Sequence, residues 1–153
     1  MDFTFSDSTF SKNFLLGQEL QKRGFISQEQ LDEALIYQVR KNIRLGEALL
    51  DLGYVREKDL DQVIADQFGI EYFELKDKKI DEELVKLLPH GSIKKYALIP
   101  IKLEKETLTV CVSDPLDAKL VKYLQEHVDI NVKLAIASRT EIEKKIEEFF
   151  YQS

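Results

Sequence analysis

Over the first half of the chain, apolar residues recur with the spacing of a helix face, and the pattern occurs twice. Residues 15–38 form the first copy and residues 44–67 the second, with residues 39–43 between them. The positions that match when one copy is laid on the other are Leu16 and Leu45, Gly17 and Gly46, Leu20 and Leu49, Gly24 and Gly53, Leu31 and Leu60, Asp32 and Asp61, Leu35 and Ile64, and Gln38 and Gln67. An internal repeat usually marks one supersecondary unit per copy. Two copies are too few for a solenoid, so we expect one pseudo-symmetric helical lobe.

Each copy predicts two short helices with a tight connection. In the first copy the opening helix ends at Gly24, a residue type that readily takes the left-handed conformation at helix ends. Phe25–Ile26 is the expected buried connector, and Ser27 with Gln30 forms a capping-box pair at the start of the next helix. The second copy repeats this plan, except that Arg56 replaces the capping serine and weakens that start signal.

The N-terminal segment, residues 1–14, is polar but also carries several phenylalanines. These aromatic residues are Phe3, Phe5, Phe10 and Phe14. A disordered tail rarely contains so many aromatic rings. We therefore expect a loose arm that lays some of the rings on the body of the protein, with the first helix starting at about Leu15.

After Ile70 the helical spacing gives way to short apolar, β-branched runs. Residues 98–103 and 107–112 are separated by charged residues and predict a β-hairpin. The other expected elements are a short strand at 72–75, a helix at 81–88, a turn through 92–96, a helix from the turn at 113–115 to about 127, a strand at 131–137 and a closing helix to about 150. The predicted fold is therefore α+β: an arm (1–14), a lobe of four short helices built from two related hairpins (15–69), and a small α/β sandwich lobe of hairpin, helix, strand and helix (70–153). We place the boundary between the lobes near residues 69–77, where polarity rises.

The composition indicates a soluble, globular protein. Of the 153 residues, 44% are hydrophobic and 33% are charged, and the net charge of −6 argues against a nucleic-acid partner, which usually requires a basic face. The single cysteine, Cys111, cannot form an internal disulfide, so we expect a cytoplasmic location. No apolar run approaches the roughly 18 residues that cross a bilayer, and the N-terminus does not resemble a signal peptide.

No group of residues indicates catalysis. The chain lacks the GxxxxGK[ST] sequence of a P-loop nucleotidase. His90 and His127 are isolated, at no metal-ligand spacing to each other or to Cys111, which lies in an apolar strand pattern typical of a core position. We therefore predict no enzymatic activity, cofactor or metal site for this chain by itself.

The repeat offers residues for binding instead. Arg44, Leu45 and Gly46 open a helix, where the first N–H groups lack partners and favour anions, and glycine permits a close approach. Leu60, Ile64 and Gln67 share one helix face, and two aliphatic side chains beside an amide suit a flat heterocycle with a polar edge, such as a nucleobase. The first copy supplies the matching set Leu16, Gly17, Leu31, Leu35 and Gln38. A pseudo-twofold site would suit a twofold ligand.

A purely structural interpretation of the same residues stays open. Leucines at helical spacing usually belong to a core, and Gly24 and Gly53 are ordinary helix ends. Duplicated helical hairpins often exist only to pack on each other. From the residues alone, nucleotide binding is one of two alternatives.

The doubled pattern resembles the signature of the MshEN domain, the N-terminal regulatory domain of assembly ATPases in type II secretion and type IV pili. The second copy fits the signature at Arg44, Leu45, Gly46, Leu49, Leu50, Gly53, Val55, Leu60, Ile64 and Gln67. The segment Val110–Leu116 also resembles the second half of that family, so the likeness covers nearly the whole chain. Family members with intact motifs bind cyclic di-GMP, which is therefore the ligand that the resemblance implies.

The resemblance also implies roles for individual residues. Motif leucines and Ile64 would pack around the guanines, and Gln38 and Gln67 would hydrogen-bond them. Arg44 would contact a base or a phosphate, and Glu47 would accept hydrogen bonds from the N–H groups of the guanine edge. Asp114 would be an acidic residue that the second lobe contributes to the site. The complete expected ligand-binding set is Leu16, Gly17, Leu31, Leu35, Gln38, Arg44, Leu45, Gly46, Glu47, Leu60, Ile64, Gln67 and Asp114.

The first copy departs from the signature at its first position, where Leu15 stands in place of arginine. A charge-assisted hydrogen bond contributes about 1.5–3 kcal/mol, so the missing guanidinium weakens or abolishes binding.

Two functional hypotheses follow from the resemblance. The first is a cyclic di-GMP-binding regulatory domain that acts on an ATPase motor domain in cis and an inner-membrane platform protein, in the cytoplasm or at the inner membrane through these partners. The alternative is a docking module of the same fold that binds a membrane-platform component without nucleotide.

Overall fold

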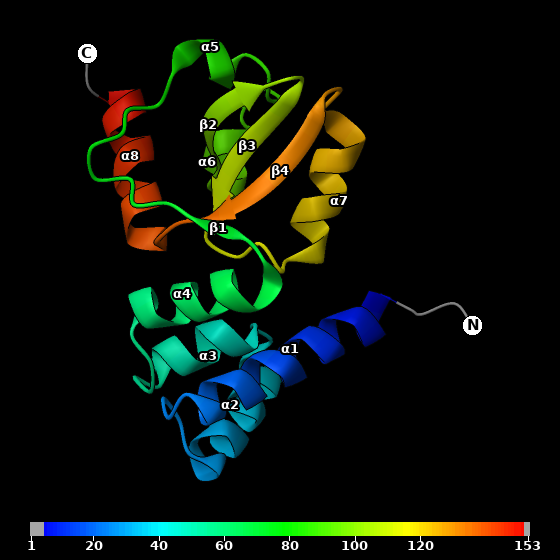
Figure 1. Ribbon diagram of the computed structural model, residues 1–153, viewed down its shortest axis with the longest axis vertical. Helices are drawn as coiled ribbons and strands as arrows, with labels where there is room; N and C mark the ends of the chain where they lie inside the picture. Colours follow the sequence, from blue (N-terminus) through cyan, green and yellow to red (C-terminus); the bar gives the residue numbers. More distant parts are fainter. Residues whose placement is uncertain (1–4, 152–153) are drawn as a thin grey trace. The chain divides into compact units, whose positions relative to one another are not determined.

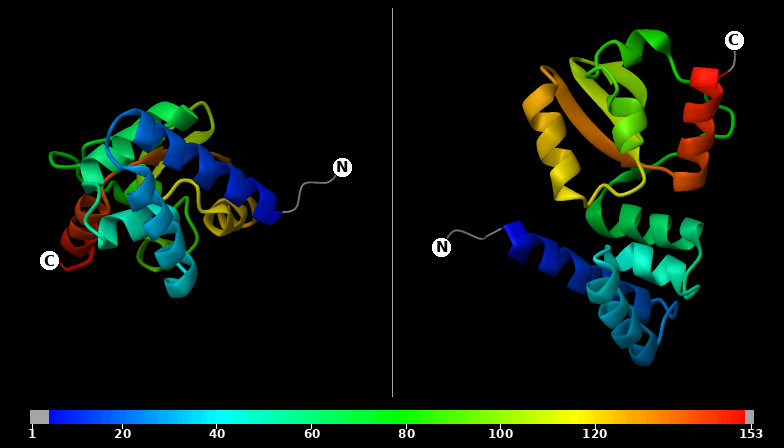
Figure 2. Two further views of the ribbon diagram at one scale, coloured as in Figure 1. Left: turned by 90° about the horizontal axis from the view of Figure 1, so that it is seen from below. Right: turned by 180° about the vertical axis from the view of Figure 1, so that it is seen from behind.

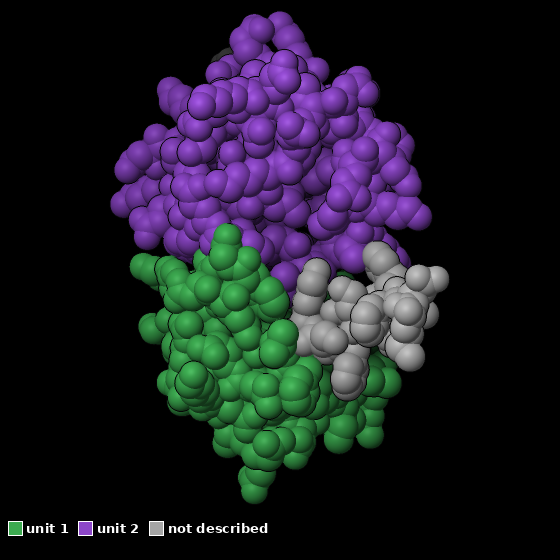
Figure 3. Space-filling view, turned by 45° about the vertical axis from the view of Figure 1, so that its right-hand side comes forward, with its two compact units in different colours: residues 1–69 green, residues 70–153 purple. Residues whose placement is uncertain are grey.

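The computed structural model describes residues 5–151 of the chain, which divides into two compact units. Unit 1 comprises residues 1–69 and unit 2 residues 70–153, shown in different colours in Figure 3. The division follows Gly69, which ends the last helix of unit 1 with a left-handed backbone (φ 65°). The division falls at the start of residues 69–77, the range in which the sequence pattern changes.

Unit 1 consists of helices whose ends match the signals in the sequence. The helices are α1 (Phe5–Lys22), α2 (Gln28–Lys41), α3 (Leu45–Asp51) and α4 (Glu57–Phe68). Gly24 and Gly53 have φ values of 81° and 74°, as the left-handed stops after α1 and α3 require. The capping box is present, because Ser27 Oγ accepts from Gln30 N at 3.1 Å while Ser27 N donates to Gln30 Oε1 at 2.9 Å. Arg56 makes no side-chain cap on α4.

The helices of unit 1 pair in a pattern that relates the two sequence copies by a pseudo-twofold operation. α1 packs against α4, and α2 packs against α3. Since α1 corresponds to α3 and α2 to α4 in the repeat, exchanging the copies converts one pair into the other. A simple tandem stack would place α2 on α3 without bringing α1 to α4. The matching leucines Leu20 and Leu49 are fully buried.

Two expectations for unit 1 are wrong. Helix α1 begins at Phe5, so residues 5–14 belong to a helix and not to a loose arm, and α1 is long (18 residues). The physical reason is that residues 5–14 contain no proline or glycine, and extending an existing packed helix costs little per residue. Phe14 is exposed, while Phe3 and the side chains of Phe5 and Phe10 lie outside what the structure describes. In the connector, Ile26 is buried but Phe25 is 37% exposed.

Unit 2 contains a four-stranded mixed sheet in the order β1-β4-β3-β2. Its strands are β1 (Glu71–Tyr72), β2 (Ile99–Glu104), β3 (Thr107–Val112) and β4 (Asn131–Ile136). β4 runs parallel to both β1 and β3, whereas β2 and β3 form the expected antiparallel hairpin. Its turn residues, Lys105 and Glu106, have φ values of 47° and 67°, which suits a type I′ turn. β1 is shorter than the strand expected at 72–75.

Helices cover both faces of this sheet, as Figure 1 and the view from behind in Figure 2 show. They are α5 (Glu82–Val85), α6 (Ser92–Tyr96), α7 (Ala118–His127) and α8 (Arg139–Tyr151). Leu108 and Val110 of β3 pack with Leu120 of α7 on one face. Cys111, which follows Val110 and points to the opposite face, packs with Ile142 of α8. The alternation of side chains along β3 thus builds two cores, and the predicted α+β class is confirmed.

None of the helices within residues 5–151 combines the length and hydropathy that a membrane crossing requires.

Candidate ligand-binding site

The apolar members of the expected site lie mainly in the core of unit 1. The buried ones are Leu16, Leu31, Leu45, Leu60 and Ile64. Leu35 differs, with 39% of its surface exposed on α2. Packing between helices therefore accounts for most of the motif leucines, and Leu35 offers the most accessible aliphatic surface among them.

The motif glycines serve a contact that is repeated in both copies. A Cβ atom on Gly17 would lie 3.0 Å from Cδ1 of Leu31, and one on Gly46 would lie 3.2 Å from Cδ2 of Leu60. Leu31 and Leu60 are themselves matching positions of the repeat. Both separations are shorter than ordinary van der Waals contact, so each glycine permits the helix to approach the leucine of the following helix. Helix packing therefore explains the presence of both glycines, whether or not a ligand binds.

The first residue of each motif has a different backbone setting. Arg44 is the N-cap of α3, with φ −86° and ψ 158°, and makes no side-chain cap. The N–H groups of Leu45, Gly46 and Glu47 therefore lie in a first turn, where helices lack internal partners. Leu15, in contrast, lies inside α1, where backbone N–H groups are satisfied by the preceding turn. The two motif starts are thus unlike in backbone as well as in side chain.

The terminal glutamine of the second copy contacts the start of the first copy. Gln67 Nε2 donates to the backbone oxygen of Leu15 at 2.8 Å. Its Oε1 is buried and accepts no hydrogen bond from the residues that the structure describes. The matching Gln38 is half-buried near the end of α2. The contact places position 67 beside position 15, as the pseudo-twofold pairing of α1 with α4 requires.

Two tyrosines connect α2 to the second copy. The hydroxyl of Tyr54 donates to the carboxylate of Glu33, and this hydrogen bond is the largest cause of the raised pKa of Tyr54. The hydroxyl of Tyr37 donates to Asp51 Oδ2 at 3.3 Å. Desolvation is the largest cause of the raised pKa of Tyr37, followed by the charge of Asp51. Both phenols stay neutral and donating at physiological pH.

Asp114 belongs to unit 2, where it stabilises a turn. Its Oδ1 accepts from Leu116 N at 3.1 Å, the Asx-turn geometry expected before a proline. Pro115 and Leu116, which follow it, are buried.

Cys111 and His127 both have structural surroundings. Burial in the sheet core raises the pKa of Cys111 to about 12, so its thiol is protonated and unreactive. His127 Nδ1 lies 2.9 Å from the backbone oxygen of Tyr123, and its ring stacks on that tyrosine. Within residues 5–151 no cluster of histidine, cysteine and carboxylate side chains has metal-binding geometry.

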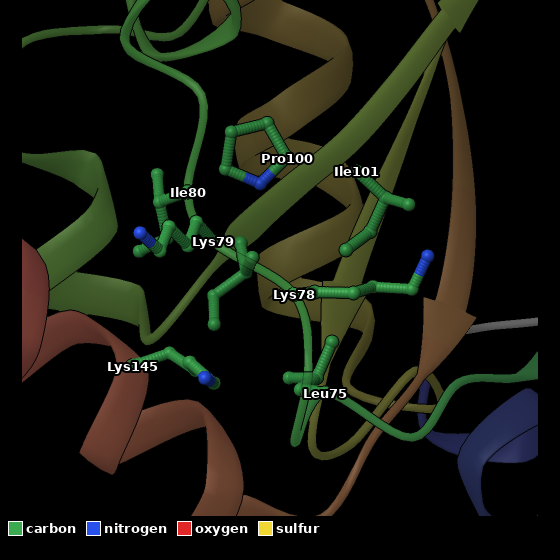
Figure 4. Close-up of a pocket in the computed structure, with 8 residues that line it drawn as sticks. Leu75, Lys78, Lys79, Ile80, Pro100, Ile101 and Lys145 are labelled. Atoms are coloured by element: carbon green, nitrogen blue, oxygen red, sulfur yellow. The ribbon is translucent and has the colours of Figure 1, made fainter.

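Sequence reasoning missed a pocket of about 160 Å³ in unit 2, shown in Figure 4. It is lined by Leu75, Lys78, Lys79, Ile80, Ile99, Pro100, Ile101 and Lys145. The lysine-rich stretch at residues 76–79 is its one visible signal in the sequence. The pocket combines residues from the segment after β1, from β2 and from α8, so no linear motif marks it.

Comparisons with known proteins agree on one family. The sequence model of the MshEN domain matches residues 68–153, more than half of the chain. The type IV pilus assembly ATPase PilB of Myxococcus xanthus is 28% identical over 135 residues, which are 88% of this chain and 24% of PilB, so the chain spans about a quarter of that relative. The structure of MshE with cdg (cyclic di-GMP) is similar with a TM-score of 0.76 and 27% identity, over 88% of this chain and 98% of that one.

The N-terminal domain of XpsE supports the fold alone, with a TM-score of 0.75 and 21% identity over 96% of this chain and 97% of that one. The match of the family model over more than half of the chain decides the assignment, and the MshE and XpsE structures have the same mixed α+β fold. The chain therefore belongs to the MshEN domain family.

Proposed function

We propose that this chain is a cyclic di-GMP-binding regulatory domain of a type II secretion or type IV pilus assembly ATPase, without catalytic activity of its own. The observation that carries the proposal is the pseudo-twofold pairing of α1 with α4 and α2 with α3. It arranges two copies of one motif as symmetric partners, and cyclic di-GMP consists of two identical halves. The similarity to MshE, solved with cyclic di-GMP, supports the same ligand here.

The proposed site uses the polar and accessible members of the two motifs. Leu35 offers an exposed aliphatic surface for a guanine face. The amides of Gln38 and Gln67 would bond the guanine edges, and Arg44 would contact a phosphate or a base through its charged donors. Glu47 is exposed in the first turn of α3, where its carboxylate can accept from guanine N–H groups. Asp114 stays a prediction from the family resemblance.

The unlike motif starts make the proposed site unequal. The half that begins at Arg44 has a guanidinium, while the half that begins at Leu15 lacks one. One charge-assisted hydrogen bond contributes about 1.5–3 kcal/mol, so its absence lowers the affinity by about one to two powers of ten relative to a site with both arginines.

Substituting Arg44 tests the proposal. The variant Arg44→Ala should lose at least about tenfold in affinity for cyclic di-GMP, because it removes the remaining motif guanidinium. Calorimetric titration measures this loss. The matched control is Arg56→Ala, which removes the same charge from the exposed N-cap of α4. Equal affinities for the wild type and Arg44→Ala would remove Arg44 from the site.

A second candidate function is docking to a membrane-platform component without nucleotide. The observation that favours it is a group of exposed apolar side chains on α2, where Ile36 and Val39 are 56% and 78% exposed beside Leu35. Such grouped apolar exposure is typical of interaction surfaces. Under this alternative, cyclic di-GMP has no effect on the chain, and polar substitutions at Ile36 and Val39 abolish binding to the partner.

A further inference from the structure

Helix α2 has one face buried in unit 1 and the opposite face open to solvent. Leu31 and Ala34 are buried on the inner face. Ile36 follows Ala34 by two residues, which is roughly 200° around the helix, and it is exposed on the opposite side. Val39 is three residues further along and more exposed still. Two β-branched apolar side chains therefore lie on the open face of α2.

The matching face of α4 is covered. Asp61 and Ala65 correspond to Asp32 and Ile36 in the repeat, and only 4% and 5% of their surfaces are exposed. Asp32 and Ile36, in contrast, are both exposed. The motif thus buries this face in its second copy and leaves it open in the first. An open apolar face that its counterpart buries is a candidate interaction surface.

The charges on the open face of α2 are placed evenly about Ile36. Asp32 lies four residues before Ile36 and Arg40 four residues after it, so the three side chains share one face. Asp32 Oδ1 accepts a hydrogen bond from Gln28 Nε2 at 2.8 Å. Within residues 5–151, Arg40 has no carboxylate partner. The face therefore has an acidic end, an apolar centre and a basic end whose guanidinium is available for pairing.

This arrangement is complementary to itself. If a second α2 lies antiparallel to the first, with a twofold axis at Ile36, Asp32 of each copy comes level with Arg40 of the other. The two Ile36 side chains then meet at the axis, with Val39 beside them. Two equivalent ion pairs enclose an apolar centre, as a twofold interface requires. A parallel pairing would instead bring like charges together at both ends.

We propose that the open face of α2 is a self-association surface, through which two copies of this chain form an antiparallel, twofold dimer. A contact between two single helices is smaller than the roughly 1,200 Å² or more that stable interfaces bury, so we expect association in the high-micromolar range. Low salt strengthens it, because the ion pairs are exposed. The surface contains none of the expected ligand-binding residues, so dimerisation is independent of nucleotide binding.

The first test is sedimentation velocity of the full chain without nucleotide, at concentrations from about 10 µM to 1 mM, which span the expected affinity. The sedimentation coefficient should rise from that of a monomer to that of a dimer. Asp32→Arg and Arg40→Asp should each weaken association by at least about tenfold, because each places like charges at both ion pairs. Ile36→Lys should abolish it, because two ammonium groups would meet at the axis.

Mixing the two charge variants gives the sharpest test. Asp32→Arg and Arg40→Asp should form a heterodimer about as readily as the wild type associates, because each variant supplies the charges that the other lacks at both pairs. Fluorescence-detected sedimentation with a label on one variant measures this heterodimer. Rescue by mixing also shows that both variants are folded.

Matched controls lie on α7. Glu126→Arg and Lys122→Asp make the same two changes in charge at an exposed pair four residues apart, and both should associate as the wild type does. Equal losses in the α7 variants would attribute association to net charge and not to α2.

Three results would overturn the proposal. These are a monomer at millimolar concentration in low salt, undiminished association of Asp32→Arg and Arg40→Asp, or no heterodimer in their mixture. A chain that stays monomeric would leave the open face of α2 to a different protein, such as the membrane-platform component of the alternative function. Since no nucleotide is present, none of these results bears on cyclic di-GMP binding.

Discussion

The two copies of the helical motif agree in their interior and differ at their edges. In both, a leucine at the same position is fully buried (Leu20 and Leu49), and a glycine allows the same close approach to a leucine. At the first position, however, one copy has Arg44 at the start of a helix and the other has Leu15 within a helix. Packing requires the shared residues in both copies, whereas the residues at the two motif starts lie outside the buried core.

The difference at the motif starts separates two uses of a duplicated motif, which are helix packing and ligand recognition. Symmetric packing survives the loss of arginine at position 15, because Leu15 is 45% exposed and contributes little to the core. Under the proposed function, symmetric ligand recognition is lost, because the half that begins at Leu15 has no guanidinium. The comparison therefore predicts a symmetric response of stability to matched core substitutions and an asymmetric response of binding to substitutions at the motif starts.

The largest expected effect is on stability. Leu20→Ala and Leu49→Ala should each lower the free energy of unfolding by about 2–5 kcal/mol, because both remove a fully buried side chain. Chemical denaturation measures both losses. If one substitution lowers the free energy of unfolding several times more than the other, the two copies are not equivalent in their packing.

Restoring the missing arginine should have a smaller effect. Leu15→Arg should tighten cyclic di-GMP binding by about tenfold, since it adds a guanidinium at the position that matches Arg44. The side chain at this position is partly exposed, so arginine fits without loss of packing. Titration calorimetry gives the affinity, with Glu29→Gln on exposed α2 as a control for the same change in net charge. An unchanged affinity would mean that the departure at Leu15 does not limit binding.

The smallest expected effects concern the second helix of each copy. Ser27→Ala should lower stability by about 1 kcal/mol, because it removes the capping bond to Gln30 N. Arg56→Ser should raise stability by up to about the same amount, since α4 has no side-chain cap. The second gain is reduced by loss of the exposed pair between Arg56 and Asp59. Thermal unfolding of both variants checks whether capping is as asymmetric as the structure indicates.

Features set by local chemistry could be predicted from the sequence. The glycine stops at Gly24 and Gly53, the capping box at Ser27 and the hairpin turn at Lys105 and Glu106 all depend on residues within a few positions of each other. The α+β class follows from the same signals. These elements need no knowledge of distant contacts.

Features set by distant contacts could not be predicted. Helix α1 extends back to Phe5 because it continues from a packed segment, which the polar composition of residues 5–14 does not reveal. Helical spacing places Leu31 and Leu60 on apolar faces, but the spacing does not distinguish burial by another helix from burial by a ligand. The pocket near Leu75 requires three separate segments to meet.

The most direct test of the central claim is calorimetric titration of the chain with cyclic di-GMP, with GTP and cyclic di-AMP as controls. We predict selective binding of cyclic di-GMP near one ligand per chain, because the pseudo-twofold pairing joins the two motifs into one proposed site. An absence of heat at high micromolar cyclic di-GMP would contradict this account. The paired helices would then serve packing alone, and the exposed apolar side chains of α2 would become the first place to search for a protein partner.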